Sequence, residues 1–412
     1  MFSEVISLRK AIPQLLARND DDFVDRLNHR HSVALFIIFA LIVSTKQYVG
    51  EPITCWAPKH FESSHEEFAN SYCWVKNTYY LPWDDYIPKP HEKRYIIPYY
   101  QWVPLFLLVQ ALMFYIPILI WRNLNERSGI DCNDIVETAE KYQFAEESEV
   151  KRKVLRFLTS QMDRYLMISK KPDDDDEVMW RCNPKWIFAR LCCCVGTAGK
   201  QRFGNYLVGL YMFVKTLFLA NCIGQLFLLN FFLGTDFNMY GIHVMTALIK
   251  GEDWTNTERF PRVSMCDFHV RRLGNLHRYT VQCVLPINLF NEKIYLFVWF
   301  WLFFLCLVTA VNYVTWIFRL AFRVDRFRFI KRQLRKQTKY DSGDEDDRKY
   351  FSYFIRSYLR QDGVFVCRLI ALNTNPIIVG EFVQALWENF RKNPPRILRS
   401  KLPEKIELTD EV

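Results

Sequence analysis

The sequence predicts an all-α membrane protein with four transmembrane helices, and three observations lead to this fold class. The stretch 102–121 has 20 residues without a charge, and at 1.5 Å per helical residue it spans about 30 Å, the thickness of a bilayer's hydrocarbon core. The stretch 294–318 has 25 uncharged residues. The 412 residues also include 34 Phe, 21 Tyr and 12 Trp, and strongly charged segments separate the apolar runs.

The remaining two spans are less uniform. The first, 32–49, has an apolar core and then a polar end that includes Lys46 and Gln47. The third, 206–233, contains one charged and three amide side chains, which we interpret as interhelical packing contacts: Lys215, Asn221, Gln225 and Asn230.

The second span, 102–121, begins at an aromatic collar. The collar consists of Tyr99, Tyr100, Gln101, Trp102 and Val103. Rings with one polar end are favoured at the headgroup level, so this segment is predicted to lie at the membrane interface. Pro104 follows in the first helical turn, where its missing N–H costs little.

Basic residues near the span ends predict the orientation. Residues 319–332 carry six basic side chains and one acidic side chain, and basic residues flank both ends of 122–205. The segments 1–31, 122–205 and 319–412 are therefore expected in the cytosol, with the loops 50–101 and 234–293 outside. The protein is expected in the plasma membrane, surrounded by lipid, with both termini cytosolic.

The cysteines agree with this topology. Of the 12 cysteines, two lie in each outside loop: Cys55 and Cys73, then Cys266 and Cys283. An oxidising exterior favours disulfides, but four cysteines allow three pairings and the sequence does not choose among them. A second cysteine cluster precedes the third span and consists of Cys192, Cys193 and Cys194. These cysteines are either palmitoylated or unmodified thiols, and the sequence does not decide between the two states.

The cytosolic segments are predicted to form a helical domain. Apolar residues keep helical spacing over 150–166, 350–359 and 376–390, and Asn375 followed by Pro376 is typical of a helix start. The acidic runs 173–177 and 341–347 lack the ligand spacing of a calcium loop and are interpreted as solvated surface.

No catalytic constellation is found, so we expect neither an enzyme nor a cofactor. The segment 196–201 resembles the end of a P-loop, but Cys194 stands where the first glycine belongs and no Ser or Thr follows the lysine. The net charge of +9 arises beside the apolar runs and does not indicate a nucleic-acid partner.

Four spans, two cysteines in each outside loop and the sequence Tyr99-Tyr100-Gln101-Trp102-Val103 resemble the innexins, the invertebrate gap-junction proteins. The resemblance covers about residues 1–320. It implies a homo-oligomeric hemichannel, an octamer, that docks onto a hemichannel of the neighbouring cell. Other innexins are further possible partners. It also implies disulfides between the loops, Cys55 with Cys283 and Cys73 with Cys266, in a loop region that can include a small β-sheet.

The resemblance also implies pore-lining residues. It places the N-terminal residues Met1, Phe2, Ser3 and Glu4 in the pore mouth, whereas the residues alone favour an amphipathic helix on a surface or at the membrane interface. Lys46, Gln47 and Glu51 are candidates for the outer pore lining. The alternative for Lys46 and Gln47 is that they lie at the end of the span and extend their polar groups to the membrane interface.

Two further expectations concern the mechanism. Pro117, near the cytosolic end of the second span, is a candidate bend or gating hinge.

The expected function is passive passage of ions and small solutes through a gap junction. The alternatives are a non-junctional hemichannel that releases solutes and a cell-adhesion or scaffold protein. A transporter is disfavoured because the four spans show no internal repeat.

Overall fold

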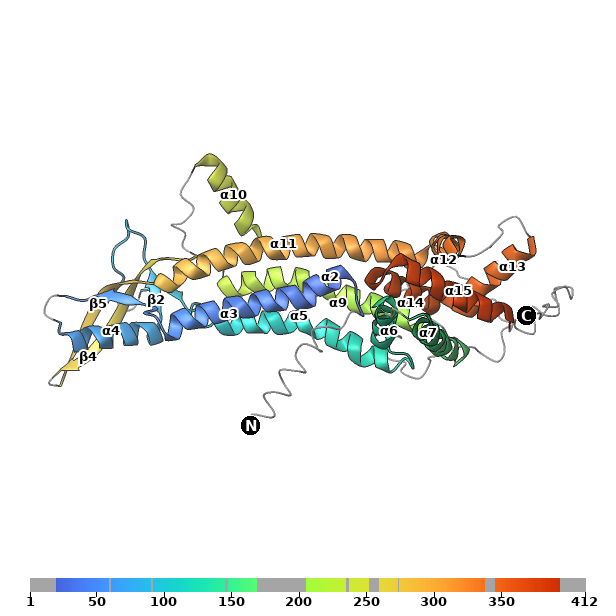
Figure 1. The fold of residues 1–412 in the computed structure, drawn as a ribbon. Helices are drawn as coiled ribbons and strands as arrows, with labels where there is room; N and C mark the ends of the chain where they lie inside the picture. Colours follow the sequence, from blue (N-terminus) through green and yellow to red (C-terminus); the bar gives the residue numbers. More distant parts are fainter. Residues whose placement is uncertain are drawn as a thin grey trace, which may run out of the picture. The chain divides into compact units, whose positions relative to one another are not determined.

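The computed structural model describes residues 20–58, 61–89, 92–144, 147–168, 205–234, 237–251, 259–272, 274–337 and 345–392 (Figure 1). They belong to two compact units. The first unit comprises Met1–Asp25, Ile118–Thr216 and Asn312–Val412, and the second comprises Arg26–Pro117 and Leu217–Val311. Each unit is described by itself.

The four-span fold class is confirmed. Four helices are long and apolar enough to cross a membrane: Phe23–Tyr48, which contains α2 (Phe23–Arg26), the π-helical turn η1 (Leu27–Ser32) and α3 (Val33–Tyr48); α5 (Val103–Glu126); α9 (Tyr206–Leu233); and α11 (Pro286–Ala321). The first begins nine residues before position 32, because Asn28, His29 and Ser32 are buried polar residues that a hydropathy pattern does not recognise. Helix α11 likewise begins at Pro286 rather than at 294. Its first turns contain the buried polar residues Asn288 and Asn291.

Aromatic stacking and a few polar contacts hold the spans together in the second unit. Phe36 of α3 stacks on Phe114 of α5 at 5.6 Å between ring centroids, and Phe106 stacks on Phe232 of α9 at 3.9 Å. The Gln110 amide donates a 2.9 Å hydrogen bond to the Gln225 side-chain oxygen. Within lipid such polar groups must find partners in the protein, so the structure agrees with a packing role for Gln225.

The second unit also contains a five-stranded antiparallel sheet built from the loops 50–101 and 234–293 between the spans. Its order is β1-β5-β4-β2-β3. The strands are β1 (Thr54–Trp56), β2 (Thr78–Tyr80), β3 (Tyr95–Ile97), β4 (Val263–Arg272) and β5 (Asn275–Val284). The long β4–β5 hairpin turns at Gly274, whose φ of +86° favours glycine.

Helical segments accompany the sheet and the second loop. Helix α4 (Ser63–Lys76) begins at a capping box formed by Glu62 and His65. The short 3₁₀ segment η3 (Phe237–Met239) leads into α10 (Tyr240–Lys250), which ends at Gly251 in the left-handed conformation. Neither α4 nor α10 was predicted from the sequence.

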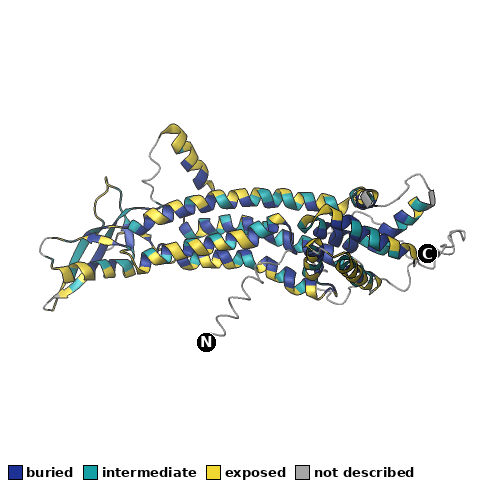
Figure 2. Cartoon of the chain, in the orientation of Figure 1, coloured by how far each residue is buried: buried dark blue, intermediate teal, exposed yellow. Residues whose placement is uncertain are grey.

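The first unit is a layer of helices, as the apolar spacing predicts. Besides the span ends it contains α6 (Cys132–Phe144), α7 (Ser148–Ile168), α12 (Arg323–Gln337), α13 (Glu345–Tyr353), the π-helical η4 (Phe354–Leu359), α14 (Arg360–Asn373) and α15 (Pro376–Lys392). Helix α14 is buried along most of its length (Figure 2). Asn375 precedes α15, and its side chain accepts the Ile377 N–H at 3.3 Å, which is the predicted N-cap.

Candidate functional site

Two disulfides join the loop 50–101 to the loop 234–293. In the sheet, Cys55 of β1 lies directly opposite Cys283 of β5, and the two sulfurs are 2.04 Å apart. Cys73 of α4 is bonded to Cys266 of β4. These are the same two pairs that the resemblance implies. The bonded cysteines are 228 and 193 positions apart in the sequence. The first loop is therefore covalently fixed to the second.

The aromatic collar ties the end of α4 to the start of α5. Tyr100 is fully buried, and its ring centroid lies 4.9 Å from that of Trp74. The Gln101 amide donates to the Trp74 carbonyl, and the Tyr99 hydroxyl donates to the Arg259 carbonyl at 2.6 Å. Burial raises the pKa of Tyr100 to about 12, so its hydroxyl stays neutral at physiological pH. The collar therefore positions the disulfide-linked loops on the membrane span.

A charged centre connects β4 to β5, to β2 and to the residue before β3. The Asp267 carboxylate of β4 lies 2.7 Å from Arg94 and 2.7 Å from Arg278, and it accepts a 3.2 Å hydrogen bond from Tyr79. Burial alone would raise the pKa of Asp267, but hydrogen bonds from Thr280 and Arg278 and the charge of Arg94 outweigh it and hold the pKa below its usual range. Asp267 was not among the residues predicted from the sequence.

The candidate pore residues have different environments. Glu51 is exposed and Lys46 is half-buried. Gln47 is only 8% exposed, and its amide donates a 2.7 Å hydrogen bond to the Tyr100 carbonyl. A buried amide with a backbone partner does not face a water-filled pore, so the assignment of Gln47 to the pore lining is corrected to a packing role.

The other candidates are only partly placed. Met1, Phe2, Ser3 and Glu4 lie outside the described residues, and so do Cys192, Cys193 and Cys194. Pro117 is buried inside α5, and its role as a hinge stays a prediction.

The first unit contains a buried charge cluster that was not predicted from the sequence. The Lys215 ammonium of α9 lies 2.6 Å from Asp22 Oδ2 and 2.8 Å from Asp25 Oδ1. Trp316 donates a 2.8 Å hydrogen bond to Asp22, and the Tyr211 hydroxyl donates a 2.9 Å bond to Asp25. All three charged side chains are at most 6% exposed. A lone lysine in an apolar span needs a counter-ion, and the acidic run before the first span could have suggested one.

A neighbouring carboxylate fixes the start of α9. Asp362 of α14 accepts the Val208 N–H at 3.1 Å and the Tyr165 hydroxyl at 3.0 Å. Burial raises the pKa of Asp362 to about 6, although these hydrogen bonds oppose the shift. Through this contact the helical layer is joined to the end of a membrane span.

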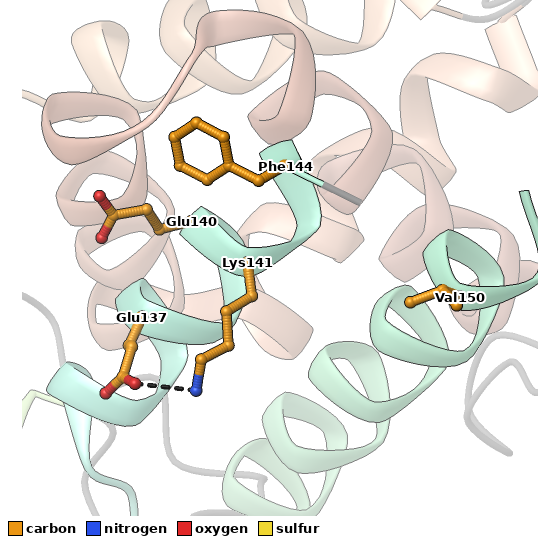
Figure 3. Close-up of a pocket in the computed structure, with 5 residues that line it drawn as sticks. All are labelled: Glu137, Glu140, Lys141, Phe144 and Val150. Carbon is orange, nitrogen blue, oxygen red and sulfur yellow. Dashed lines mark ion pairs between the residues drawn. The ribbon is translucent and has the colours of Figure 1, made fainter. Parts of the chain in front are cut away.

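A shallow depression between α6 and α7 is lined by Glu137, Glu140, Lys141, Phe144 and Val150 (Figure 3). The Lys141 ammonium lies 2.8 Å from Glu137, four residues earlier on the same helix. Both side chains are more than half exposed, so this is an ordinary surface ion pair of a helix.

Four membrane-length helices and two loops linked by disulfides define a four-span membrane protein with a covalently fixed loop domain. The sequence profile of the innexins matches residues 21–390. "Innexin unc-9" of Caenorhabditis elegans is 37% identical over 385 residues, which cover 93% of this chain and 95% of that protein. "Innexin-10" and "Innexin-3" of the same organism are each 36% identical, over 94% and 90% of this chain and 68% and 84% of their own lengths. The chain belongs to the innexin family, whose members form gap-junction channels in invertebrates.

Proposed function

We propose that this chain is a gap-junction channel subunit that passes ions and small solutes passively between adjacent cells. Membership in the innexin family across residues 21–390 is the observation that carries the proposal. The two disulfides between the outside loops support it, because two rigid faces can dock with less loss of conformational entropy than two flexible ones.

The finer assembly belongs to the same proposal. Identical subunits form a ring, an octamer by the family resemblance, with both termini in the cytosol and the disulfide-linked loops outside. The positive charge after the fourth span supports this orientation. The N-terminal residues Met1–Glu4, together with Lys46 and Glu51, line the solute path.

Three measurements on cells that express only this chain separate this function from its alternatives. Transfer of a small fluorescent tracer into a neighbouring cell is the expected result. Tracer release into the medium without transfer would indicate an unpaired hemichannel, and cell clustering without transfer would indicate an adhesion protein. The ring size is checked separately by native mass measurement of the purified assembly, for which eight copies are expected.

A further inference from the structure

Helix α10 carries three distinct faces. The face formed by Tyr240, Gly241 and Val244 is buried against the second unit. At Gly241 the contact is with α11, because a Cβ at this glycine would lie 2.0 Å from the Trp299 ring. Only a glycine allows the backbone of α10 to approach the span so closely.

A second face of α10 is apolar and exposed. Successive residues of a helix are about 100° apart, so Ile242, Met245 and Ile249 form one stripe. Their exposed fractions are 51%, 47% and 80%, and Leu248, three residues after Met245, borders the stripe at 55%. For a helix of eleven residues this is a large uncovered apolar surface.

The third face of α10 is polar. His243, Thr246 and Lys250 follow the same helical spacing on the remaining side of the helix, and all three are exposed. The apolar surface is therefore confined to one side of the exposed part of the helix. This division is typical of helices that lie in a membrane interface, with the polar face toward water.

The contact with Trp299 places the start of α10 at the depth of a membrane span. Trp299 is the sixth residue of the uncharged stretch 294–318 of α11, about 8 Å from its outer end at 1.5 Å per residue. Phe300, Phe303 and Phe304, which follow on α11, are 39%, 46% and 51% exposed. Figure 1 shows α10 diverging from α11. The start of α10 thus lies beside an apolar and partly exposed stretch of a span.

We propose that α10 is an interfacial helix whose stripe, Ile242, Met245, Leu248 and Ile249, is buried among the lipids of the outer leaflet. The position of the start of α10 beside this apolar stretch of α11 favours lipid over a neighbouring subunit as the occupant. Lys250 at the end of the helix can extend its ammonium to the headgroups. The proposal rests on the proposed orientation only in naming the leaflet as the outer one.

Nitroxide accessibility in the full chain tests this proposal. A spin label is attached to Ile249→Cys, and the protein is reconstituted into phosphatidylcholine vesicles. Thr246→Cys serves as the matched control on the polar face, and the unsubstituted chain gives the background from its own thiols. At position 249 we expect high accessibility to oxygen and low accessibility to a water-soluble nickel complex, and the reverse at position 246.

Two outcomes would overturn the proposal. High nickel accessibility at position 249 would place the stripe in water. Low accessibility to both reagents would mean that protein covers it, and cross-linking through the same position would then reveal a neighbouring subunit. If the Ile249→Cys chain does not assemble, Met245→Cys reports on the same stripe.

Discussion

Lys215 is a charged residue in an apolar span, and its environment explains how the span tolerates it. Its ammonium contacts both Asp22 and Asp25 in a site from which water is excluded. Removing one partner of a buried ion pair leaves uncompensated charge and costs about 3–5 kcal/mol. We expect Lys215→Met to lower the melting temperature of the detergent-solubilised protein strongly, measured by the loss of monodisperse protein on heating.

Lys141→Met is the matched control for that experiment. Lys141 pairs with a single carboxylate, that of Glu137. The Lys141 side chain is 68% exposed and that of Glu137 is 53% exposed. Exposed pairs contribute little to stability, so this variant should melt like the parent. Equal melting of the two variants would show that the Lys215 cluster does not stabilise the fold.

Asp267 predicts a dependence of stability on pH. Its pKa in the fold is held below the usual value of 3.8, so the ionised form contributes stability above that value. The contribution is lost as the pH falls through the lowered folded pKa. We expect Asp267→Asn to melt at a lower temperature than the parent at neutral pH. The difference should shrink as the pH falls below 3.8, and a difference independent of pH would contradict the role of the charge.

Glu51 and Gln47 should respond differently to substitution. Glu51 is exposed, so Glu51→Lys should shift the reversal potential of hemichannel currents in a salt gradient toward anion selectivity if this position lines the path. Gln47 is buried against the Tyr100 carbonyl, so Gln47→Leu should reduce the amount of folded protein without changing the reversal potential. The opposite pattern would return Gln47 to the pore.

These residues show what a sequence can and cannot predict about side chains. A packing role for Gln225 follows from chemistry alone, because a polar group in an apolar helix needs a partner. The partner of Gln47 is a backbone carbonyl, which no sequence pattern marks. The partners of Lys215 lie almost 200 positions earlier, in a segment too polar to be taken as part of a span.

At the scale of elements, long apolar helices were predictable and short mixed ones were not. The bounds of α9, 206–233, are those predicted, because its apolar run ends where the helix ends. Helices α4 and α10 lie in loops that were interpreted only through their cysteines and charges. The strand pairing of β1 with β5 depends on residues more than 200 positions apart, which local periodicity does not detect.

The disulfide pattern is a prediction about these elements in the expressed protein. The register of β1 against β5 and the position of α4 beside β4 favour Cys55–Cys283 and Cys73–Cys266. Such bonds typically contribute about 2–4 kcal/mol. Peptide mass spectrometry without reduction should find both cross-loop pairs, and a peptide joining Cys55 to Cys73 would refute the assignment.

Pro117 gives a prediction about helix α5. A proline inside a helix removes one backbone hydrogen bond and is a common site of bending. If this bend is used in gating, Pro117→Ala should change the voltage dependence of junctional current while surface expression stays the same. If gating is unchanged in this variant, Pro117 is not a gating hinge and affects only the shape of the resting helix.

At the scale of the whole molecule, the four spans and the helical layer follow from hydropathy, charge and apolar spacing. The function as a junctional channel does not follow from these, because the same span count fits adhesion proteins. The signature Tyr99–Val103 and the cysteine placement suggested the family, and the match over residues 21–390 established it. The structure adds the reason for the signature, which fixes the outside loops to the second span.

The most direct test of the account is the electrical current between two paired cells that express only this chain. We predict a junctional conductance well above that of untransfected pairs, and its loss when Cys73→Ser and Cys266→Ser together remove one link between the outside loops. Surface labelling must show that the double variant still reaches the membrane. Absence of junctional current for the parent chain, with the protein present at the contact between the cells, would contradict the assignment of this chain as a gap-junction channel subunit able to act alone.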